Sequence, residues 1–361
     1  MKWSWKIGAI AGIPIYIHST FVLILVWIGW MSTSRGEGLA ATLASLVFIL
    51  SLFGCVVLHE LGHALTARRY GIRTRDITLL PIGGLARLER MPEDPRQEFW
   101  VALAGPAVNV VIALALFFLL LLQGTYESAA RFDILAGPFL WQIMVANIFL
   151  VVFNMLPAFP MDGGRVLRAL LAMRLDYTRA TQLAANVGQG MALLFALVGL
   201  LYYPVLVFIA LFVWIGASQE AGMVQMRSAL AGIPVSNAMI TEFHALTPDE
   251  PLSEAVSLTL ATAQKDFPVV EHGEVVGVLA QAELFRSLAE DGQHVAVREV
   301  MTSDFATADS FEMLEPVLAR LQSCACSTIP VLRAGVLVGI VTSDNISEFL
   351  SIQSAMGPGR G

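Results

Sequence analysis

Charged residues are scarce in this sequence. Asp, Glu, Lys and Arg make up 14% of the 361 residues and hydrophobic residues make up 56%, whereas about 25% of a typical soluble domain is charged. The deficit is uneven, because residues 38–58 and 180–219 contain no charge at all, while residues 226–361 have the composition of a soluble domain. The uncharged runs exclude an ordinary soluble protein and predict membrane-spanning helices.

The sequence also has no excess of Lys and Arg over Asp and Glu, and it has few cysteines. The net charge of −7 offers no basic surface for nucleic acid, so we expect no nucleic-acid partner. Three cysteines do not make a disulfide framework, and Cys324 and Cys326 have no second pair nearby with which to hold a metal, so we interpret them as packing residues. No convincing signal-peptide cleavage site follows Lys2 and Lys6, which predicts an uncleaved first span.

The apolar runs predict an α-helical, multi-pass cell-membrane domain. The six expected spans are about 15–31, 39–67, 98–123, 137–155, 183–201 and 205–222. Between the second and the third, residues 70–97 alternate apolar and polar side chains, which predicts short strands at the membrane surface. With the N-terminus inside, fourteen Lys and Arg residues fall on the inner side and two on the outer side. Both termini are therefore expected in the cytosol.

The second predicted span contains the sequence His59-Glu60-Leu61-Gly62-His63. Residues four apart lie on one face of a helix, so the two imidazoles can bind one metal ion. Glu60 can then take a proton from a water at that metal. Placing these three ionisable side chains at the end of a membrane-spanning apolar helix costs free energy, which indicates that they have a function. The alternative is a polar helix end at the membrane surface, or a buried pair of structural histidines.

A second polar motif, residues 154–165, follows the fourth predicted span. Its two prolines end the helix and fix an extended turn, and Gly163-Gly164 let the chain turn sharply after it. Asp162 on this turn is a candidate third ligand, because a catalytic zinc site has three protein ligands and one open position. The alternative role of Asp162 is to cap the next helix. His18 could also face the site, and Asn109 needs a polar partner.

The C-terminal part is an internal repeat. Residues 239–284 match residues 301–346 at a constant offset of 62. Each copy predicts a helix, a strand, a turn at His272-Gly273 or Ala334-Gly335, a second strand and a second helix, which make a soluble α/β domain. The expected divisions are a membrane domain 1–225, a linker 226–236, repeats 237–290 and 299–352 within a domain 237–353, and a flexible tail 354–361.

Together, H-E-L-G-H at residues 59–63 and N-M-L-P-A-F-P-M-D-G-G at residues 154–164 resemble the site-2 protease family of intramembrane zinc metalloproteases. The implied roles are Zn²⁺ ligation by His59, His63 and Asp162, acid–base catalysis by Glu60, and binding of the substrate carbonyl by Asn154. Gly105-Pro106 with Asn109 also resembles a family element, without a clear chemical role. The implied substrate is a single-pass regulatory protein in the lipid bilayer, such as a membrane-held anti-sigma or transcription factor.

The repeat pair resembles a pair of cystathionine-β-synthase-type (CBS) repeats, which implies a cytosolic regulatory domain and a homodimer. CBS pairs often bind adenosine nucleotides through Gly-apolar-apolar-Thr/Ser-x-x-Asp. This chain has Glu283 and Asn345 at the last position, and Asp344 lies one residue early. The sequence therefore departs from the nucleotide-binding pattern, and a role in dimerisation or substrate docking needs no nucleotide.

Two other functions remain open at this stage. One is a transporter, in which intramembrane His and Asp mark an ion path. However, no inverted repeat of the spans is evident, and transport does not explain why Glu60 directly follows His59. The other is a non-catalytic scaffold that senses through the repeats, against which an intact Glu60 argues.

Overall fold

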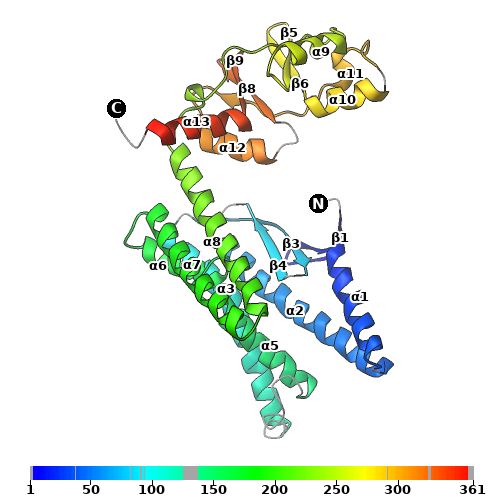
Figure 1. Ribbon diagram of the computed structural model, residues 1–361, viewed down its shortest axis with the longest axis vertical. Coiled ribbons are helices and arrows are strands. Elements are labelled where there is room, and N and C mark those ends of the chain that lie inside the picture. The colour runs from blue at the N-terminus through cyan, green and yellow to red at the C-terminus, as the bar shows by residue number, and fades with distance from the viewer. Residues whose placement is uncertain are drawn as a thin grey trace. The chain divides into compact units, whose positions relative to one another are not determined.

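A computed structural model of the protein describes residues 3–36, 38–81, 83–89, 92, 94–124, 137–290, 292–323 and 327–356. The chain forms two compact units, Met1–Val224 and Gln225–Gly361 (Figure 1). Cys324, Cys326 and most of the loop expected at residues 124–136 lie outside the described residues.

The first unit combines helices with one sheet. Its elements are β1 (Ser4–Ile10), β2 (Ile13–His18), α1 (Ser19–Ser34), α2 (Leu39–Arg69), β3 (Thr74–Leu80), β4 (Gly83–Leu88), α3 (Pro95–Leu122), α5 (Phe139–Asn154), α6 (Asp162–Ala172), α7 (Tyr177–Leu201) and α8 (Val205–Leu230), of which the last residues belong to the second unit. Four of them, α2, α3, α7 and α8, are long and apolar enough to span a membrane. Helices α1 and α5 have 16 residues each, or about 24 Å, against a hydrocarbon core of about 30 Å. The count of six spans therefore stays a prediction.

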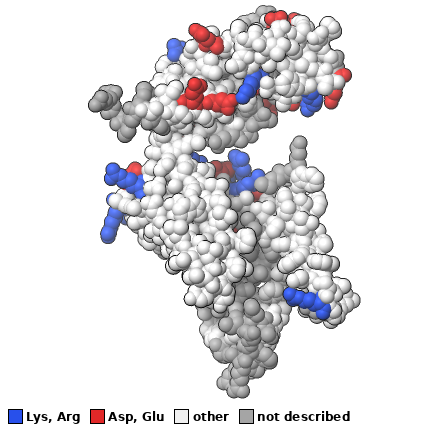
Figure 2. Space-filling model, in the orientation of Figure 1, with Lys and Arg blue, Asp and Glu red and all other residues white. Residues whose placement is uncertain are grey.

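The surface of the helices is strongly apolar. Side chains such as Leu194 (58% exposed) on α7 and Phe208 (74% exposed) on α8 would face the solvent if the protein were in water. On the side of the molecule shown in Figure 2, Lys, Arg, Asp and Glu are sparse over these helices. Large contiguous apolar surfaces are rare on soluble monomers, so this surface is suited to lipid contact.

The N-terminal residues correct the expected start of the first span at Ile15. Residues 13–18 form a strand, because isoleucine at every second position favours a pleated, half-buried conformation. Ile13 and Ile15 are buried against α2 residues. The turn between β1 and β2 is Ala11-Gly12, and both residues have positive φ, as a tight two-residue hairpin requires. Helix α1 therefore begins only at Ser19.

His18, which the sequence left as a possible neighbour of the metal motif, has a local role. It is the N-cap residue of α1, and its Nδ1 accepts a hydrogen bond from the backbone N–H of Thr20 at 3.3 Å. Capping satisfies a backbone donor that the first turn of a helix would leave unpaired. The side chain thus serves the start of α1.

One sheet of four strands joins the N-terminal hairpin to the segment after α2. Its order is β1-β2-β3-β4, with an antiparallel pair at each side and a parallel pair, Ile15 with Ile77, between β2 and β3. Strands were expected within residues 70–97, and β3 and β4 lie there. Strand β4 is at the edge of the sheet and contacts α2, which carries the histidine motif.

The second unit follows the internal repeat. Its elements are η1 (Val235–Asn237), α9 (Leu252–Ala261), β5 (Phe267–Glu271), β6 (Glu274–Leu279), α10 (Gln281–Glu290), α11 (Val297–Val300), β7 (Ala308–Asp309), α12 (Leu314–Ser323), β8 (Thr328–Arg333), β9 (Val336–Thr342) and α13 (Ser343–Met356). The predicted turns are confirmed, because His272-Gly273 and Ala334-Gly335 join β5 to β6 and β8 to β9, all four residues with positive φ. The unit has two buried apolar cores, one within residues 246–297 and the other within residues 308–346 together with Leu230, Val235 and Ala238.

The two repeats are interlocked in a symmetric way. Ile240 forms a β-bridge with Ile340, and Val278 forms one with Thr302. The two bridges are equivalent, because Thr302 and Ile340 occupy the positions in the second repeat that Ile240 and Val278 occupy in the first. Because each bridge joins one repeat to the other, the pair folds as a single unit.

Candidate metal centre

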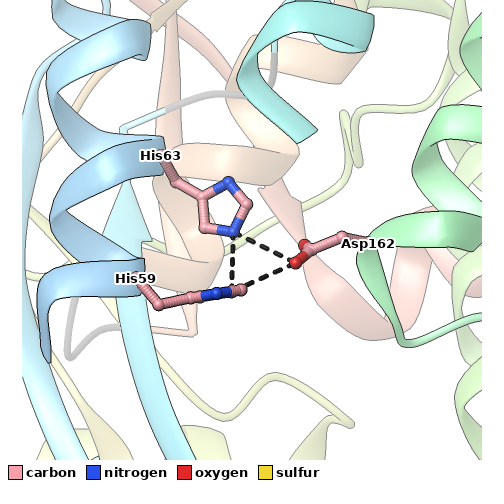
Figure 3. Close-up of side chains that lie close together, drawn as sticks. All are labelled: His59, His63 and Asp162. Carbon is pink, nitrogen blue, oxygen red and sulfur yellow. Dashed lines mark hydrogen bonds and ion pairs between the residues drawn. The ribbon is translucent and has the colours of Figure 1, made fainter. Parts of the chain in front are cut away.

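Three predicted ligands meet in the first unit. His59 and His63 lie one turn apart on α2, both buried, with their Nε2 atoms 3.1 Å apart. Asp162 is the first residue of α6, and its Oδ2 lies 3.1 Å from His59 Nε2 and 3.2 Å from His63 Nε2 (Figure 3). The two motifs, about a hundred residues apart in sequence, therefore bring two imidazoles and one carboxylate to a single point.

These donor atoms fit a zinc ion. His63 Nδ1 donates to the Val101 carbonyl oxygen at 2.7 Å, and His59 Nδ1 faces the side-chain oxygen of Asn109. With hydrogen on both Nδ1 atoms, both Nε2 atoms present lone pairs to each other and to the carboxylate. Tetrahedral ligands about 2.0–2.1 Å from zinc are about 3.3 Å apart, close to the separations found here, and two histidines with one carboxylate are a known catalytic set.

The Asp162 carboxylate is suited to such a cation. The N-cap of α6 is Met161, so Asp162 does not take the alternative capping role. Its side chain is free to point at the histidines.

Glycines of the second motif and of α3 allow close contacts, and the expected sharp turn at Gly163-Gly164 is corrected. These two residues lie in the first turn of α6, where a Cβ on Gly163 would be 2.3 Å from the Leu156 carbonyl oxygen. On α3, a Cβ on Gly105 would be 2.2 Å from His63 Nε2. Glycine thus allows one backbone to touch the Asp162 turn and another to touch the imidazoles.

An ion-pair network that the sequence does not reveal holds α6 in place. Arg168, 1% exposed, donates to Glu98 on α3 at 2.8 Å and to Glu220 on α8 at 2.5 Å. Its guanidinium also lies 5.0 Å from the ring centre of Phe159 and 5.1 Å from that of Tyr177. A single arginine therefore joins α6 to α3, α7 and α8 and to the turn before it. The sequence did offer one sign of this network, because Arg168 follows the Asp162 motif between two apolar helices, where a charged side chain needs a partner.

The two predicted catalytic residues differ in their setting. Glu60 is half-buried and lies against β4, where a Cβ on Gly84 would be 2.7 Å from Glu60 Cγ. The carboxylate is therefore beside the edge strand of the sheet. Asn154 is the last residue of α5 and is half-buried, and within the described part of the chain its side chain makes no hydrogen bond.

Comparisons with known proteins give matches to both parts of the chain. Residues 47–136 and 123–197 match the model of Peptidase family M50, and residues 235–290 and 297–352 match that of the CBS domain. Zinc metalloprotease MJ0392 of Methanocaldococcus jannaschii is 33% identical over 353 residues, 98% of this chain and 97% of that protein. This chain belongs to peptidase family M50. It is a zinc metalloprotease of the site-2 protease type with a C-terminal CBS pair, so the resemblance inferred from the motifs is confirmed.

Two other proteins are similar to this chain, one over nearly all of it and the other over part of it. The putative zinc metalloprotease Rip3 of Mycobacterium tuberculosis is 26% identical to the protease over 380 residues, 99% of this chain and 95% of Rip3. The solved site-2 protease from Methanocaldococcus jannaschii is 38% identical and covers 61% of this chain and 95% of its own, with a TM-score of 0.45.

The CBS unit of the protease contains a cleft of about 900 Å³. Ile240, Phe243, Thr262, Lys265, Thr342 and Asp344 are among the residues that line it. Lys265 Nζ donates to Asp344 Oδ2 at 2.7 Å, and this hydrogen bond raises the pKa of Lys265. The acid that lies one residue early in the nucleotide motif is thus already paired with a lysine.

Proposed function

We propose that this protease hydrolyses a peptide bond in or near the transmembrane helix of a single-pass, membrane-anchored regulatory protein. The observation that carries the proposal is the convergence of His59 Nε2, His63 Nε2 and Asp162 Oδ2 beside Glu60. Zinc bound by these three residues would supply Lewis-acid chemistry, polarising the scissile carbonyl and lowering the pKa of a water.

The side chains around the metal centre then divide the remaining work. Glu60 takes a proton from the attacking water and later passes it to the leaving amine. Asn154, at the end of α5, contacts the substrate carbonyl or the oxyanion that develops from it. The candidate ligands His59, His63 and Asp162 are buried, so little bulk water reaches this part of the site.

Strand β4 provides a place for the substrate. A helical substrate hides its carbonyl groups in its own hydrogen bonds, so it must unwind before cleavage. An extended segment can add to an exposed sheet edge, and β4 is such an edge and touches Glu60 through Gly84. Pairing there would present the peptide bond, in extended form, next to the acid–base residue.

The CBS pair is the proposed regulator. We infer that both termini are cytosolic, that the site opens towards the cytosol, and that two copies associate through the CBS units. The cleft between the repeats would hold the regulatory ligand. Because Asp344 is paired with Lys265 and the usual acidic position holds Asn345, titration of adenosine nucleotides into the whole protein is the direct test of whether that ligand is one of them.

The experiment that tests the catalytic role is the Glu60→Gln substitution. The amide keeps the shape of the side chain but cannot act as a base, so we expect normal zinc content and no cleavage of a transmembrane substrate in detergent. Glu89→Gln is a matched control, since Glu89 is exposed just after β4 and its change should leave cleavage intact. Cleavage by the Glu60→Gln protein at the wild-type rate would refute the assignment.

A further inference from the structure

Two buried asparagines link His59 to the helix interior. Asn109 on α3 and Asn147 on α5 are both 0% exposed, where an unpaired amide would be costly. The side-chain oxygen of Asn109 faces His59 Nδ1, and Asn109 Nδ2 donates to Asn147 Oδ1 at 2.8 Å. The two amides therefore form a chain that ends on the ring nitrogen facing away from the metal centre.

One backbone carbonyl fixes the direction of this chain. The carbonyl oxygen of Ile143 can only accept, so Asn147 must turn its Nδ2 towards it, at 2.8 Å. Asn147 Oδ1 then faces Asn109, which must donate through its own Nδ2. The Asn109 oxygen is left for His59, which must donate from Nδ1.

A hydrogen on Nδ1 leaves the lone pair of His59 on Nε2, the atom that faces His63 and Asp162. We propose that Asn147 is a positioning residue that acts through Asn109 to fix His59 in its metal-binding tautomer. This proposal rests on zinc ligation by His59. His63 needs no such relay, because its Nδ1 donates to a backbone carbonyl that has only one possible role.

Loss of the Asn147 oxygen would release this constraint. The Asn109 amide could then rotate and present Nδ2 to His59, which favours the opposite tautomer, with hydrogen on Nε2 directed at the metal. Groups that orient a metal-binding histidine typically contribute about 10- to 100-fold to metal affinity. We expect a loss within this range for Asn147→Leu, which keeps the size of the side chain but has no acceptor.

Two single variants separate the relay from packing. In Asn147→Asp, a protonated carboxyl can still donate to the Ile143 carbonyl and accept from Asn109, so zinc affinity should stay near the wild-type value. Cys55→Ala removes a buried neighbour whose Sγ lies 3.4 Å from Asn147 Nδ2 but leaves the relay intact, so it should also bind zinc normally. Affinity is measured on whole, folded protein in detergent, by competition with a chromophoric chelator.

A double variant provides a rescue. An ionised carboxylate at position 109 can only accept, so Asn109→Asp should hold the Nδ1–H tautomer without help from Asn147. Asn109→Asp/Asn147→Leu should therefore recover the affinity that Asn147→Leu loses. If Asn147→Leu does not fold, comparing this double variant with Asn109→Leu/Asn147→Leu gives the same contrast, and only the second should bind zinc weakly.

Each outcome has one meaning. Wild-type zinc affinity in Asn147→Leu, or equal affinity in the two double variants, would overturn the relay. An equal loss in Cys55→Ala and Asn147→Leu would assign the effect to packing and would overturn it as well. Failure of zinc ligation itself would show differently, as wild-type protein that does not retain zinc.

Discussion

Gly105→Ala tests the geometry of the metal centre with a single methyl group. The added Cβ would lie 2.2 Å from His63 Nε2 and 2.7 Å from His59 Nε2. A normal contact is about 3.5 Å, so the methyl group and the His63 ring must separate by about 1.3 Å. Metal sites tolerate shifts of about 0.2 Å in ligand distance. We therefore expect loss of stoichiometric zinc and at least about a 100-fold loss of cleavage.

The control for this variant is Gly54→Ala. Gly54 lies on α2, the helix of the histidine motif, and its added Cβ would meet nothing within 4 Å. Zinc is measured by elemental analysis of protein purified in detergent, and cleavage by the release of a product from a transmembrane substrate. Full zinc and normal cleavage in Gly105→Ala would refute the described contact between α3 and the imidazoles, whereas Gly54→Ala should match the wild type.

Three further changes test other parts of the site. Asp162→Ala should abolish stoichiometric zinc, measured in the same way, and full zinc retention would exclude Asp162 as a ligand. Arg168→Met leaves Glu98 buried without its partner and should destabilise the protein by about 3–5 kcal/mol, seen in thermal unfolding in detergent; Arg168→Lys should lose less because it keeps the charge. Gly84→Val would push into Glu60, so cleavage should fall while zinc content stays normal, and a parallel loss of zinc would contradict this reasoning.

The sequence was most informative where the chemistry depends on local geometry. The four-residue spacing of His59 and His63 places both on one helix face whatever surrounds the helix. The motif around Asp162 combines a helix stop with a single acid, which nominated a third ligand once His59 and His63 had supplied the first two. The CBS hairpins were equally local, because paired positive-φ residues such as His272-Gly273 specify a tight turn.

Contacts between elements that are distant in sequence could not be predicted from local patterns. Nothing in the sequence says that Gly105 faces the imidazoles, or that Asn147 and Arg168 have partners on other helices. An amide or a cation in an apolar region did signal that a partner must exist, without saying which. Hydropathy also concealed the N-terminal hairpin, whose alternating isoleucines in residues 13–17 were the signal that it differed from a helix.

The parallel pairing of β2 with β3 limits how the chain can be threaded through a bilayer. Hydrogen bonds between Ile15–Ile17 and Ile77–Leu79 hold two points of the chain together, and α1 and α2 form the excursion between them. An excursion that returns to its starting point must cross an even number of times. If α2 traverses the lipid, the return crossing therefore falls to α1 despite its 16 residues, and the bilayer around it must thin or the flanking residues must extend to the interface.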